Sequence, residues 1–496
     1  MPVDQSNGHR PTRSYLPAAP GIPAASGRRT GAHAFAGVDW DAVGQLRQQV
    51  AERMALWRRG DGAAQDQAGH DVFALGVCQE EVSEYLVDRV RAGATRYSAG
   101  EERSLVEAVH AAAFGLGRIQ PLIDDPDLEN IEVNGFDNVI LLYADGRIET
   151  GPPVADSDRQ LLADLQYWAA RAGRSFTTAR PHLNLELPGG ARLAAQIETV
   201  KRPTMTIRLH RVVDTSLRDL VARGAVSQAL AQFLQACVLA NANLVITGPP
   251  GAGKTTLMRA LAAAIPPWER YATLESDREL HLDELGRHLR MVSYEAREGS
   301  SEQSLDGRPV GQVTLSDLVE VALRGNYSRL LLGEVRGREV TALLEAISTG
   351  GKGSFCTIHA NSAADAFERI VSLCLTRSGI TAELAYRLAA QSLQYIVHVD
   401  LVDDSIHAAQ PAGAVARRRF VTEVLAVEGI GEFGRPITTR VFASTGHEGR
   451  AEPAGHLPRD ITRLERAGLD RGWLLRDRAS TWTYPTTFPA PPGGGA

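Results

Sequence analysis

The sequence is poor in cysteine, in aromatic side chains (6%) and in long apolar runs. Only four cysteines occur in 496 residues, and none belongs to a CxxC pair: Cys78, Cys237, Cys356 and Cys374. This spacing argues against a zinc ribbon or a disulfide framework and fits a reducing compartment. No stretch approaches the ~20 apolar residues that span a bilayer, and the opening segment lacks the apolar core of a secretory signal. We therefore expect a cytoplasmic protein with no transmembrane segment of its own.

Basic residues are not in excess either. The chain has 53 Lys and Arg against 59 Asp and Glu, which gives a formal net charge of -6. A dedicated nucleic-acid-binding protein usually shows a strong basic excess, so direct nucleic-acid binding is not expected, although a local basic patch is not excluded. Hydrophobic residues make up 44% and charged residues 23%, as in ordinary soluble globular proteins. The length allows about two to four domains.

The first half of the chain divides into three segments by composition and periodicity. Residues 1–37 are rich in Pro, Gly, Ser and Ala, which predicts a disordered tail. Residues 38–117 space apolar side chains at three and four, which predicts helices. Residues 118–212 combine β-branched runs, Asn-Gly and Asp-Gly turn signals and one helical stretch, which predicts a compact α+β domain with antiparallel strands.

The second half opens with a helical bridge, residues 213–242. From 243 to 445 short apolar runs alternate with helical patterns, which is typical of a parallel α/β sheet. A strand pair closes this region, and its first strand begins with three arginines, Arg417–Arg419, which we interpret as a solvated strand edge. Residues 446–496 form a C-terminal extension that ends in a low-complexity, partly disordered stretch.

The strongest motif is NLVITGPPGAGKTTLMRALAAAI, which runs from a short apolar strand through a glycine-rich loop into a helix. It matches the full GxxxxGK[ST] pattern in its strand–loop–helix context. Gly251 and Gly253 let backbone N–H groups surround a phosphate, and the helix N-terminus adds its dipole. Lys254 should reach the β- and γ-phosphates and the Thr255 hydroxyl should ligate Mg²⁺. The motif predicts nucleotide binding.

Hydrolysis also needs carboxylates beside the metal and the attacking water. Glu334 follows the buried run 330–332, and an acid at the carboxyl end of a central strand points into the crevice where such sheets bind ligands. Glu275 ends another apolar run, with Asp277 and Glu279 close behind. His359 stands near the end of STGGKGSFCTIHANS with no second histidine or carboxylate at metal-ligand spacing. Taken alone, His359 is most simply a core or loop histidine with a structural role, whose ring nitrogens have hydrogen-bond partners.

In this order the motifs resemble those of the type II and type IV secretion and pilus-assembly motor ATPases, most closely the tight-adherence (CpaF-type) pilus branch. The resemblance covers roughly residues 105–445. ITGPPGAGKTTLMRAL is similar to the Walker A motif of that family, TLESDREL to its acidic box, LLLGEVRGREV to its Walker B motif and STGGKGSFCTIHANS to its His box. It implies a P-loop, RecA-like C-terminal ATPase domain and a smaller α+β N-terminal domain, preceded by helices and the disordered tail, with ATP held between the two domains.

The resemblance also implies roles for individual residues. Glu334 would sit by Mg²⁺ together with Thr255, and Glu275 would polarise the attacking water. His359 would contact the γ-phosphate, and Arg192 and Arg208 of the N-terminal domain would close onto the nucleotide. Which of Arg324, Arg329 and Arg336 touches phosphate stays open. The residues implied to bind phosphates are Gly248, Pro249, Pro250, Gly251, Ala252, Gly253, Lys254, Thr255 and Thr256.

By the same resemblance the protein would be a homo-oligomer, a hexamer, that hydrolyses ATP with Mg²⁺ and acts on an inner-membrane platform protein of a pilus or secretion system. The chain departs from the family pattern at three places. It has Glu275-Ser276 where the family has Glu-Asp, Asn326-Tyr327-Ser328 where the family has Arg-Pro-Asp, and Gly351-Lys352 where the family has its first His-box histidine. Two alternatives therefore stay open: a DNA-translocating motor and a nucleotide-gated scaffold with weak hydrolysis.

Overall fold

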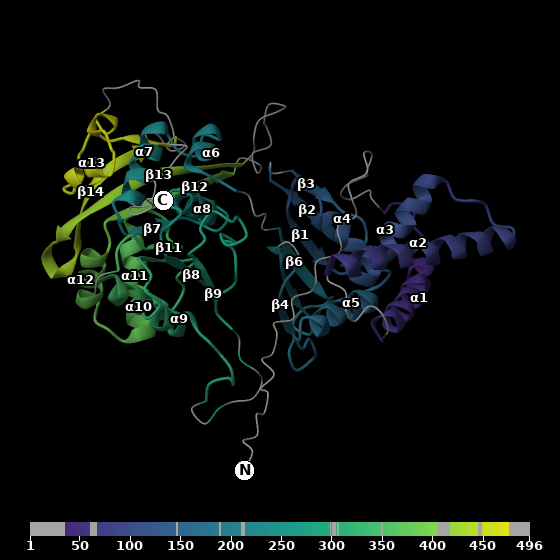
Figure 1. Cartoon of the computed structure of the whole chain (residues 1–496). Helices are drawn as coiled ribbons and strands as arrows, with labels where there is room; N and C mark the ends of the chain where they lie inside the picture. Colours follow the sequence, from purple (N-terminus) through teal and green to yellow (C-terminus); the bar gives the residue numbers. More distant parts are fainter. Residues whose placement is uncertain are drawn as a thin grey trace, which may run out of the picture. The chain divides into compact units, whose positions relative to one another are not determined.

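The computed structural model forms two compact units, Met1–Arg211 and Val212–Ala496 (Figure 1). Most of the expected disordered tail, the end of the C-terminal extension and the first glycine of the His box, Gly350, lie outside the described residues. No helix in the described part of the chain is long and apolar enough to cross a membrane. The structure describes residues 35–59, 67–144, 147–187, 190–209, 214–297, 299, 304, 307–348, 351–403, 417–444 and 449–475.

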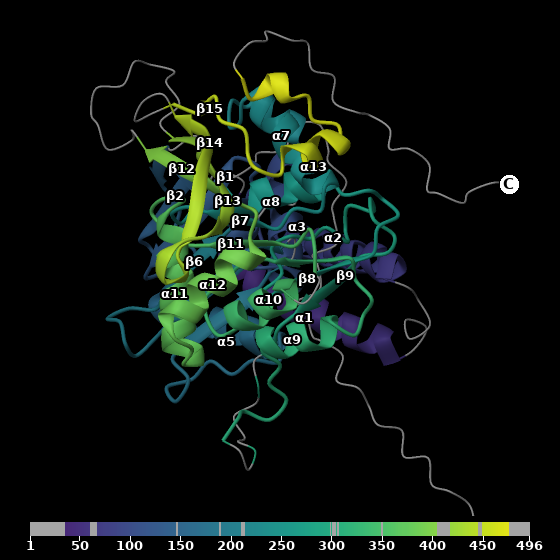
Figure 2. The same ribbon diagram turned by 90° about the vertical axis from the view of Figure 1, so that its left-hand side faces the viewer.

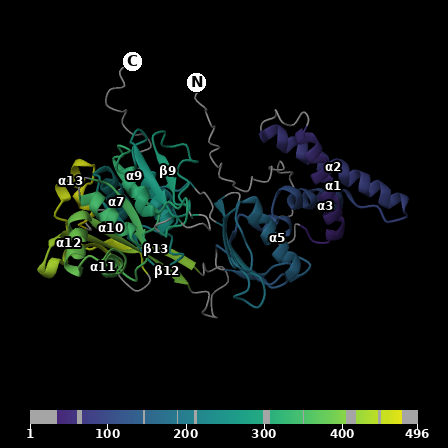
Figure 3. The same cartoon turned by 90° about the horizontal axis from the view of Figure 1, so that it is seen from below.

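The first unit begins with three helices that pack on one another: α1 (Trp40–Arg59), α2 (Gln67–Arg91) and α3 (Ala99–Phe114) (Figure 3). The Ser98 hydroxyl accepts from the Glu101 N–H while the Glu101 carboxylate accepts from the Ser98 N–H, a reciprocal cap that starts α3. Leu46, Val77 and Leu105 lie in an apolar core that belongs to these helices alone. The helical prediction for this region is confirmed.

A six-stranded antiparallel sheet forms the rest of the first unit. Its order is β3-β2-β1-β6-β5-β4, and α5 (Asp158–Arg171) packs on it through Leu161, Leu165 and Trp168. A 3-10 turn (Gly117–Ile119) and the short α4 (Gln120–Ile123) precede β1. The expected α+β fold is confirmed. The strands are β1 (Leu128–Asn134), β2 (Val139–Tyr143), β3 (Ile148–Thr150), β4 (His182–Glu186), β5 (Arg192–Gln196) and β6 (Thr204–Arg208).

The second unit is built on a nine-stranded sheet of order β15-β14-β13-β12-β7-β11-β10-β8-β9. From β12 to β9 neighbouring strands are parallel, and β13, β14 and β15 add antiparallel pairs at one side. The strands are β7 (Leu244–Thr247), β8 (Tyr271–Glu275), β9 (Val292–Glu295), β10 (Arg329–Leu332), β11 (Phe355–Ile358), β12 (Tyr395–Asp403), β13 (Arg417–Ile430), β14 (Pro436–Ser444) and β15 (Ala451–Pro453).

Helices cover both faces of this sheet (Figure 2). Because the central strands are buried on both faces, β7, β8, β10 and β11 read as nearly continuous apolar runs instead of alternating patterns. One face packs against α6 (Leu217–Ala222), α7 (Gln228–Leu239), α8 (Lys254–Ala262) and α13 (Ile461–Arg466). The other packs against α9 (Leu315–Ala322), α10 (Glu339–Ser348), α11 (Asp365–Ser378) and α12 (Ala382–Ser392).

Two segments that we expected outside the ATPase domain contribute to its core. Helices α6 and α7 come from the expected bridge, yet Leu217, Phe233 and Leu234 are fully buried in the core beneath β7. Helix α7 is apolar around most of its circumference, which favours a buried helix over a linker. Leu464 and Leu474 of the C-terminal extension are buried in the same core.

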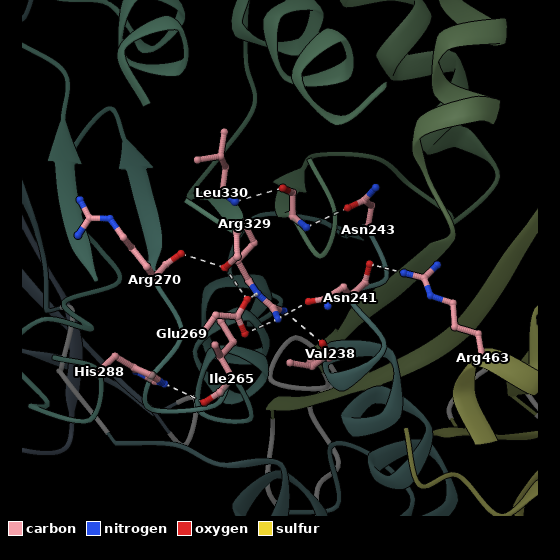
Figure 4. Close-up of polar contacts among 12 residues, drawn as sticks. Val238, Asn241, Asn243, Ile265, Glu269, Arg270, His288, Arg329, Leu330 and Arg463 are labelled. Atoms are coloured by element: carbon pink, nitrogen blue, oxygen red, sulfur yellow. Dashed lines mark hydrogen bonds and ion pairs between the residues drawn. The ribbon is translucent and has the colours of Figure 1, made fainter. Parts of the chain in front are cut away.

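At the amino edge of the sheet, where the parallel strands begin, β10 starts with the fully buried Arg329 (Figure 4). Its Nε and Nη2 donate to both carboxylate oxygens of Glu269 at 2.8 and 2.7 Å. Nη2 also donates to Asn241 Oδ1 at 2.6 Å, and Nη1 to the Val238 carbonyl at 3.2 Å. Arg329 thus links β10 to the C-terminal end of α7 and to the residues before β8.

We expect Arg329→Ala to lower the free energy of unfolding of the second unit by about 3–5 kcal/mol, because it removes a fully buried guanidinium and leaves the half-buried Glu269 without its cation. Urea denaturation followed by circular dichroism measures the change. Arg324→Ala removes an exposed arginine from the same edge and serves as the control. Equal unfolding midpoints for the two variants would contradict a structural role for Arg329.

Candidate nucleotide site

The glycine-rich loop lies at the carboxyl edge of the sheet, directly after β7. Gly253 begins α8 as its N-cap with φ +93° and ψ +22°, a left-handed conformation that suits glycine. The helix that follows therefore directs its first N–H groups into the loop, which is how helix N-termini bind phosphate. The local geometry that the motif requires is present.

Lys254 lies inside this loop and is only 7% exposed. Its Nζ donates to the carbonyls of Gly248 at 3.0 Å and Pro249 at 2.9 Å, and lies 3.1 Å from Nδ1 of His359. Burial lowers the pKa of Lys254 to about 8, although the nearby Glu334 and Glu279 carboxylates favour its charged form. The ammonium group is held where phosphate oxygens could replace the loop carbonyls.

His359 connects Lys254 to Glu334. Its Nε2 lies 3.1 Å from Glu334 Oε1, and Arg336 Nη2 donates to Glu334 Oε2 at 2.5 Å. Burial and the Lys254 charge lower the pKa of His359, which favours a neutral ring. Its Nδ1 also lies 3.2 Å from the Gly248 carbonyl oxygen. The isolated histidine of the sequence lies in a chain of polar contacts that runs from Lys254 to Arg336.

Glu275 lies beside this chain because β8 and β10 are neighbours. Leu274 pairs with Leu332 in the parallel register, so Glu275 comes next to Gly333, the residue before Glu334. The Glu275 side chain is 2% exposed, and its Oε1 accepts from the backbone N–H groups of Glu279 at 2.9 Å and Leu280 at 3.0 Å. These two bonds fix the orientation of the carboxylate.

Gly333 leaves the space that the Glu275 side chain occupies. A Cβ at this position would lie 2.9 Å from Cγ and 3.0 Å from Oε1 of Glu275. If Glu275 activates the attacking water, Gly333→Ala should displace its carboxylate and lower kcat for ATP about a hundredfold while ATP still binds. Steady-state hydrolysis and equilibrium ATP binding measure both quantities.

The control for this substitution is Gly76→Ala in α2, where an added Cβ meets nothing within 4 Å. An unchanged kcat in Gly333→Ala would show that Glu275 tolerates the methyl group or does not act in turnover.

The side chains at this edge suit Mg²⁺. The Thr255 hydroxyl donates to Glu279 Oε2 at 3.2 Å, and the Glu334 carboxylate lies close enough to Lys254 to influence its pKa. Hydroxyl and carboxylate oxygens are the hard ligands that Mg²⁺ prefers, and it usually takes only one or two carboxylates and completes its shell with water and phosphate oxygens. The described residues contain no cluster of three or more His, Cys, Asp or Glu side chains that could hold a metal ion.

The sequence did not decide which of three arginines touches phosphate, and in the structure they lie at opposite edges of the sheet. Arg324 and Arg329 precede or begin β10 and lie at the amino edge, whereas Arg336 follows β10 and lies in the site. Arg192 and Arg208 face each other across β5 and β6 of the first unit. Their closure onto the nucleotide stays a prediction.

The departures from the family pattern separate in the same way. Ser276 directly follows β8 and lies at the carboxyl edge. Asn326, Tyr327 and Ser328 precede β10 and Lys352 precedes β11, so these lie at the amino edge. His359 follows β11, so about 13 Å of extended strand separates the Lys352 end from the His359 end. A histidine at position 351 or 352 would therefore lie at the opposite edge from the phosphate loop.

Two residues at this edge were given no role in the site from the sequence. Glu279 accepts from Thr255, and Arg419 Nε donates to the Gly251 carbonyl at 2.8 Å. Arg419, which the sequence places on a solvated strand edge, thus also has a hydrogen-bond partner in the phosphate loop. Arg419 reaches the loop because the strands β12 and β13 extend past the end of β7. No local sequence motif encodes that extension. Glu279 was visible in the acidic cluster, but its spacing alone could not single it out.

Comparison with known proteins gives one family match and several relatives. The family described as type II/IV secretion system protein matches residues 160–439, more than half of the chain. A putative conjugal transfer protein of Mycobacterium tuberculosis is 32% identical over 58% of this chain and 80% of its own length. The type IV secretion system protein PtlH of Bordetella pertussis is 31% identical over 62% of this chain and 93% of its own length.

Among solved structures, the VirB11 ATPase of the Brucella suis type IV secretion system, crystallised with sulphate, aligns with a TM-score of 0.32. The two sequences are 24% identical, and the alignment covers 65% of this chain and 96% of the other.

Proposed function

Because this chain belongs to the type II/IV secretion system protein family, we propose that it is the ATP-hydrolysing motor of a pilus or secretion system at the cytoplasmic membrane. The family match covers residues 160–439 and includes the phosphate loop, both acidic motifs and His359. The chain is an ATPase with an N-terminal domain and a P-loop domain. The finer assignment, to a tight-adherence type of pilus, is supported by the motifs that resemble that branch.

The observation that carries the proposal is the meeting of Lys254, His359 and Glu334 at one edge of the sheet, with Glu275 on the adjacent strand. ATP phosphates would take over the Lys254 contacts that the loop carbonyls now make. His359, between Lys254 and Glu334, would then sense whether the γ-phosphate is present. Glu275, held by two N–H groups, would orient and deprotonate the attacking water.

Mg²⁺, held by Thr255 and Glu334 directly or through water, would neutralise charge on the phosphates. The residues of the chain bind and orient the nucleotide and the groups around it. The phosphate loop binds and orients the nucleotide, and the Arg336 guanidinium orients the Glu334 carboxylate that it contacts. Arg336 thereby adds positive charge beside the phosphates.

Arg192 and Arg208 would close onto the nucleotide from the N-terminal domain and release it after hydrolysis, which would convert turnover into a domain movement. In a homohexamer such movements would follow one another around the ring. The movements would act on a membrane-embedded platform protein. Binding to that protein would hold the cytoplasmic motor at the membrane surface.

A DNA-translocating motor is a second candidate, since one relative is named a putative conjugal transfer protein. The charge of the chain argues against it, because acidic residues outnumber basic ones by 59 to 53. A nucleotide-gated scaffold is less favoured. Of the substitutions that suggested it, Gly351-Lys352 lie at the amino edge, whereas Ser276 follows β8 at the carboxyl edge. Glu275, Glu334 and His359 all remain at that carboxyl edge.

The test is the ATP turnover of the full chain with Mg²⁺, measured with and without double- and single-stranded DNA, and with the particle mass determined on the same sample. We expect hexamer-sized particles whose turnover does not respond to DNA. A several-fold stimulation by DNA would favour the DNA motor.

A further inference from the structure

Strand β12 is longer than β7, the parallel strand with which it pairs. Its first four residues, from Tyr395 to His398, pair with the whole of β7, from Leu244 to Thr247. The next five residues, 399–403, continue past the end of β7 and pair only with the start of β13, residues 417–421. We call residues 399–403 and 417–421 the overhang. Because β7 runs directly into the phosphate loop, the overhang lies alongside that loop.

The strand changes register where the overhang begins. The pairing of β12 with β13 shifts between His398 and Val399, a β-bulge. Bulges bend a strand and redirect its side chains, and they are frequent beside active sites. The bulge therefore marks the point at which β12 stops pairing with β7 and begins to run beside the phosphate loop.

The overhang contacts the phosphate loop at three successive glycines. A Cβ on Gly248 would lie 2.1 Å from the Val399 carbonyl oxygen, so only glycine fits there. A Cβ on Gly251 would lie 3.8 Å from Leu401 Cδ2, and one on Gly253 would lie 3.7 Å from Arg419 Cδ. Leu401 and Arg419 are direct partners across β12 and β13. One cross-strand pair therefore lies beside the loop at Gly251 and Gly253.

Arg419 adds a directed polar contact, since its Nε donates to the Gly251 carbonyl at 2.8 Å. Where the loop binds phosphate through the N–H groups around Gly251, the Gly251 carbonyl must point away from the ligand. A charged donor that holds the Gly251 carbonyl on the outer side stabilises the orientation in which the neighbouring N–H groups face the ligand.

We propose that Arg419 is a positioning residue for nucleotide: it fixes the phosphate loop, through the Gly251 carbonyl, in the conformation that receives the phosphates of a nucleoside triphosphate. The inference rests on the proposed ATP-binding function. Because Arg419 acts on binding and not on the reacting atoms, its loss should raise KM and leave kcat nearly unchanged.

The experiment measures KM and kcat for ATP, and the equilibrium dissociation constant for ATP, in the full-length chain. We expect Arg419→Ala to raise KM and the dissociation constant about tenfold or more, with kcat within twofold of wild type. Arg419→Lys keeps a charged donor and should recover most of the affinity. Arg418→Ala is the matched control, because neighbouring side chains of a strand point to opposite faces.

Wild-type affinity in Arg419→Ala, or an equal loss in Arg418→Ala, would overturn the inference, and so would a fall in kcat with KM unchanged. Wild type and Lys254→Ala are measured beside these variants. If wild type binds no ATP, or if Lys254→Ala binds as wild type does, it is the nucleotide-binding function that fails, and not the role of Arg419 alone.

Discussion

Lys254→Ala is expected to abolish measurable ATP binding, with a loss of affinity of about a hundredfold or more. Its Nζ is the buried cation of the phosphate loop, held by two loop carbonyls. A desolvated ammonium group gains strong charge-assisted hydrogen bonds when phosphate oxygens reach it. Removing it takes away the only cation that the loop itself carries, and the nucleotide then depends on backbone N–H groups. Isothermal titration calorimetry with ATP measures the effect.

The control for this variant is Lys352→Ala. Lys352 is exposed and precedes β11 at the amino edge. Like Lys254 it is a lysine of the second unit, but it lies outside the nucleotide site. Circular dichroism should show the same folded content in both variants. ATP binding by Lys254→Ala at the wild-type affinity would show that the loop is not the nucleotide site.

Glu275→Gln is expected to bind ATP normally and to hydrolyse it about 10²–10⁴ times more slowly, the usual range for losing a general base. The amide keeps an oxygen that can accept from the Glu279 and Leu280 N–H groups, so the fold at the end of β8 should survive. What the substitution removes is the negative charge that, in the proposed mechanism, would take the proton from water. Phosphate release and ATP binding, measured on the same sample, separate the two effects.

Glu320→Gln is the matched control for this substitution, since it changes an exposed glutamate of α9 in the same way. Turnover by Glu275→Gln within threefold of this control would remove Glu275 from the reaction. Glu279, which lies four residues on and accepts from Thr255, would then be the next residue to test.

The parts of the site that the sequence could predict are those set by local chain geometry. A strand, a glycine-rich loop and a helix in succession fix the phosphate loop, and an acid directly after a buried strand must lie at the carboxyl edge. The same rule sorts residues that the motifs left ambiguous. Arg336 follows β10 and reaches Glu334, whereas Arg329 begins β10 and is bonded to Glu269 at the other edge.

What the sequence could not predict depends on contacts between distant segments. Arg419 reaches Gly251 only because β12 and β13 extend beyond β7 by five residues after a bulge. The helices of 214–239 read as a bridge because their burial comes from the sheet that follows them. The closing of Arg192 and Arg208 onto a nucleotide involves two units of the chain and remains a prediction.

The most direct test of the central claim, that the second unit holds a hydrolytic ATP site built on Lys254, Glu275, Glu334 and His359, is phosphate release by the wild-type chain with Mg²⁺ and with EDTA. Glu275→Gln, prepared in the same way, supplies the background. We predict turnover in wild type that requires Mg²⁺ and falls to background in Glu275→Gln while both proteins bind ATP. Wild-type protein that binds ATP with Mg²⁺ yet releases no phosphate, or equal release by both proteins, would contradict the account.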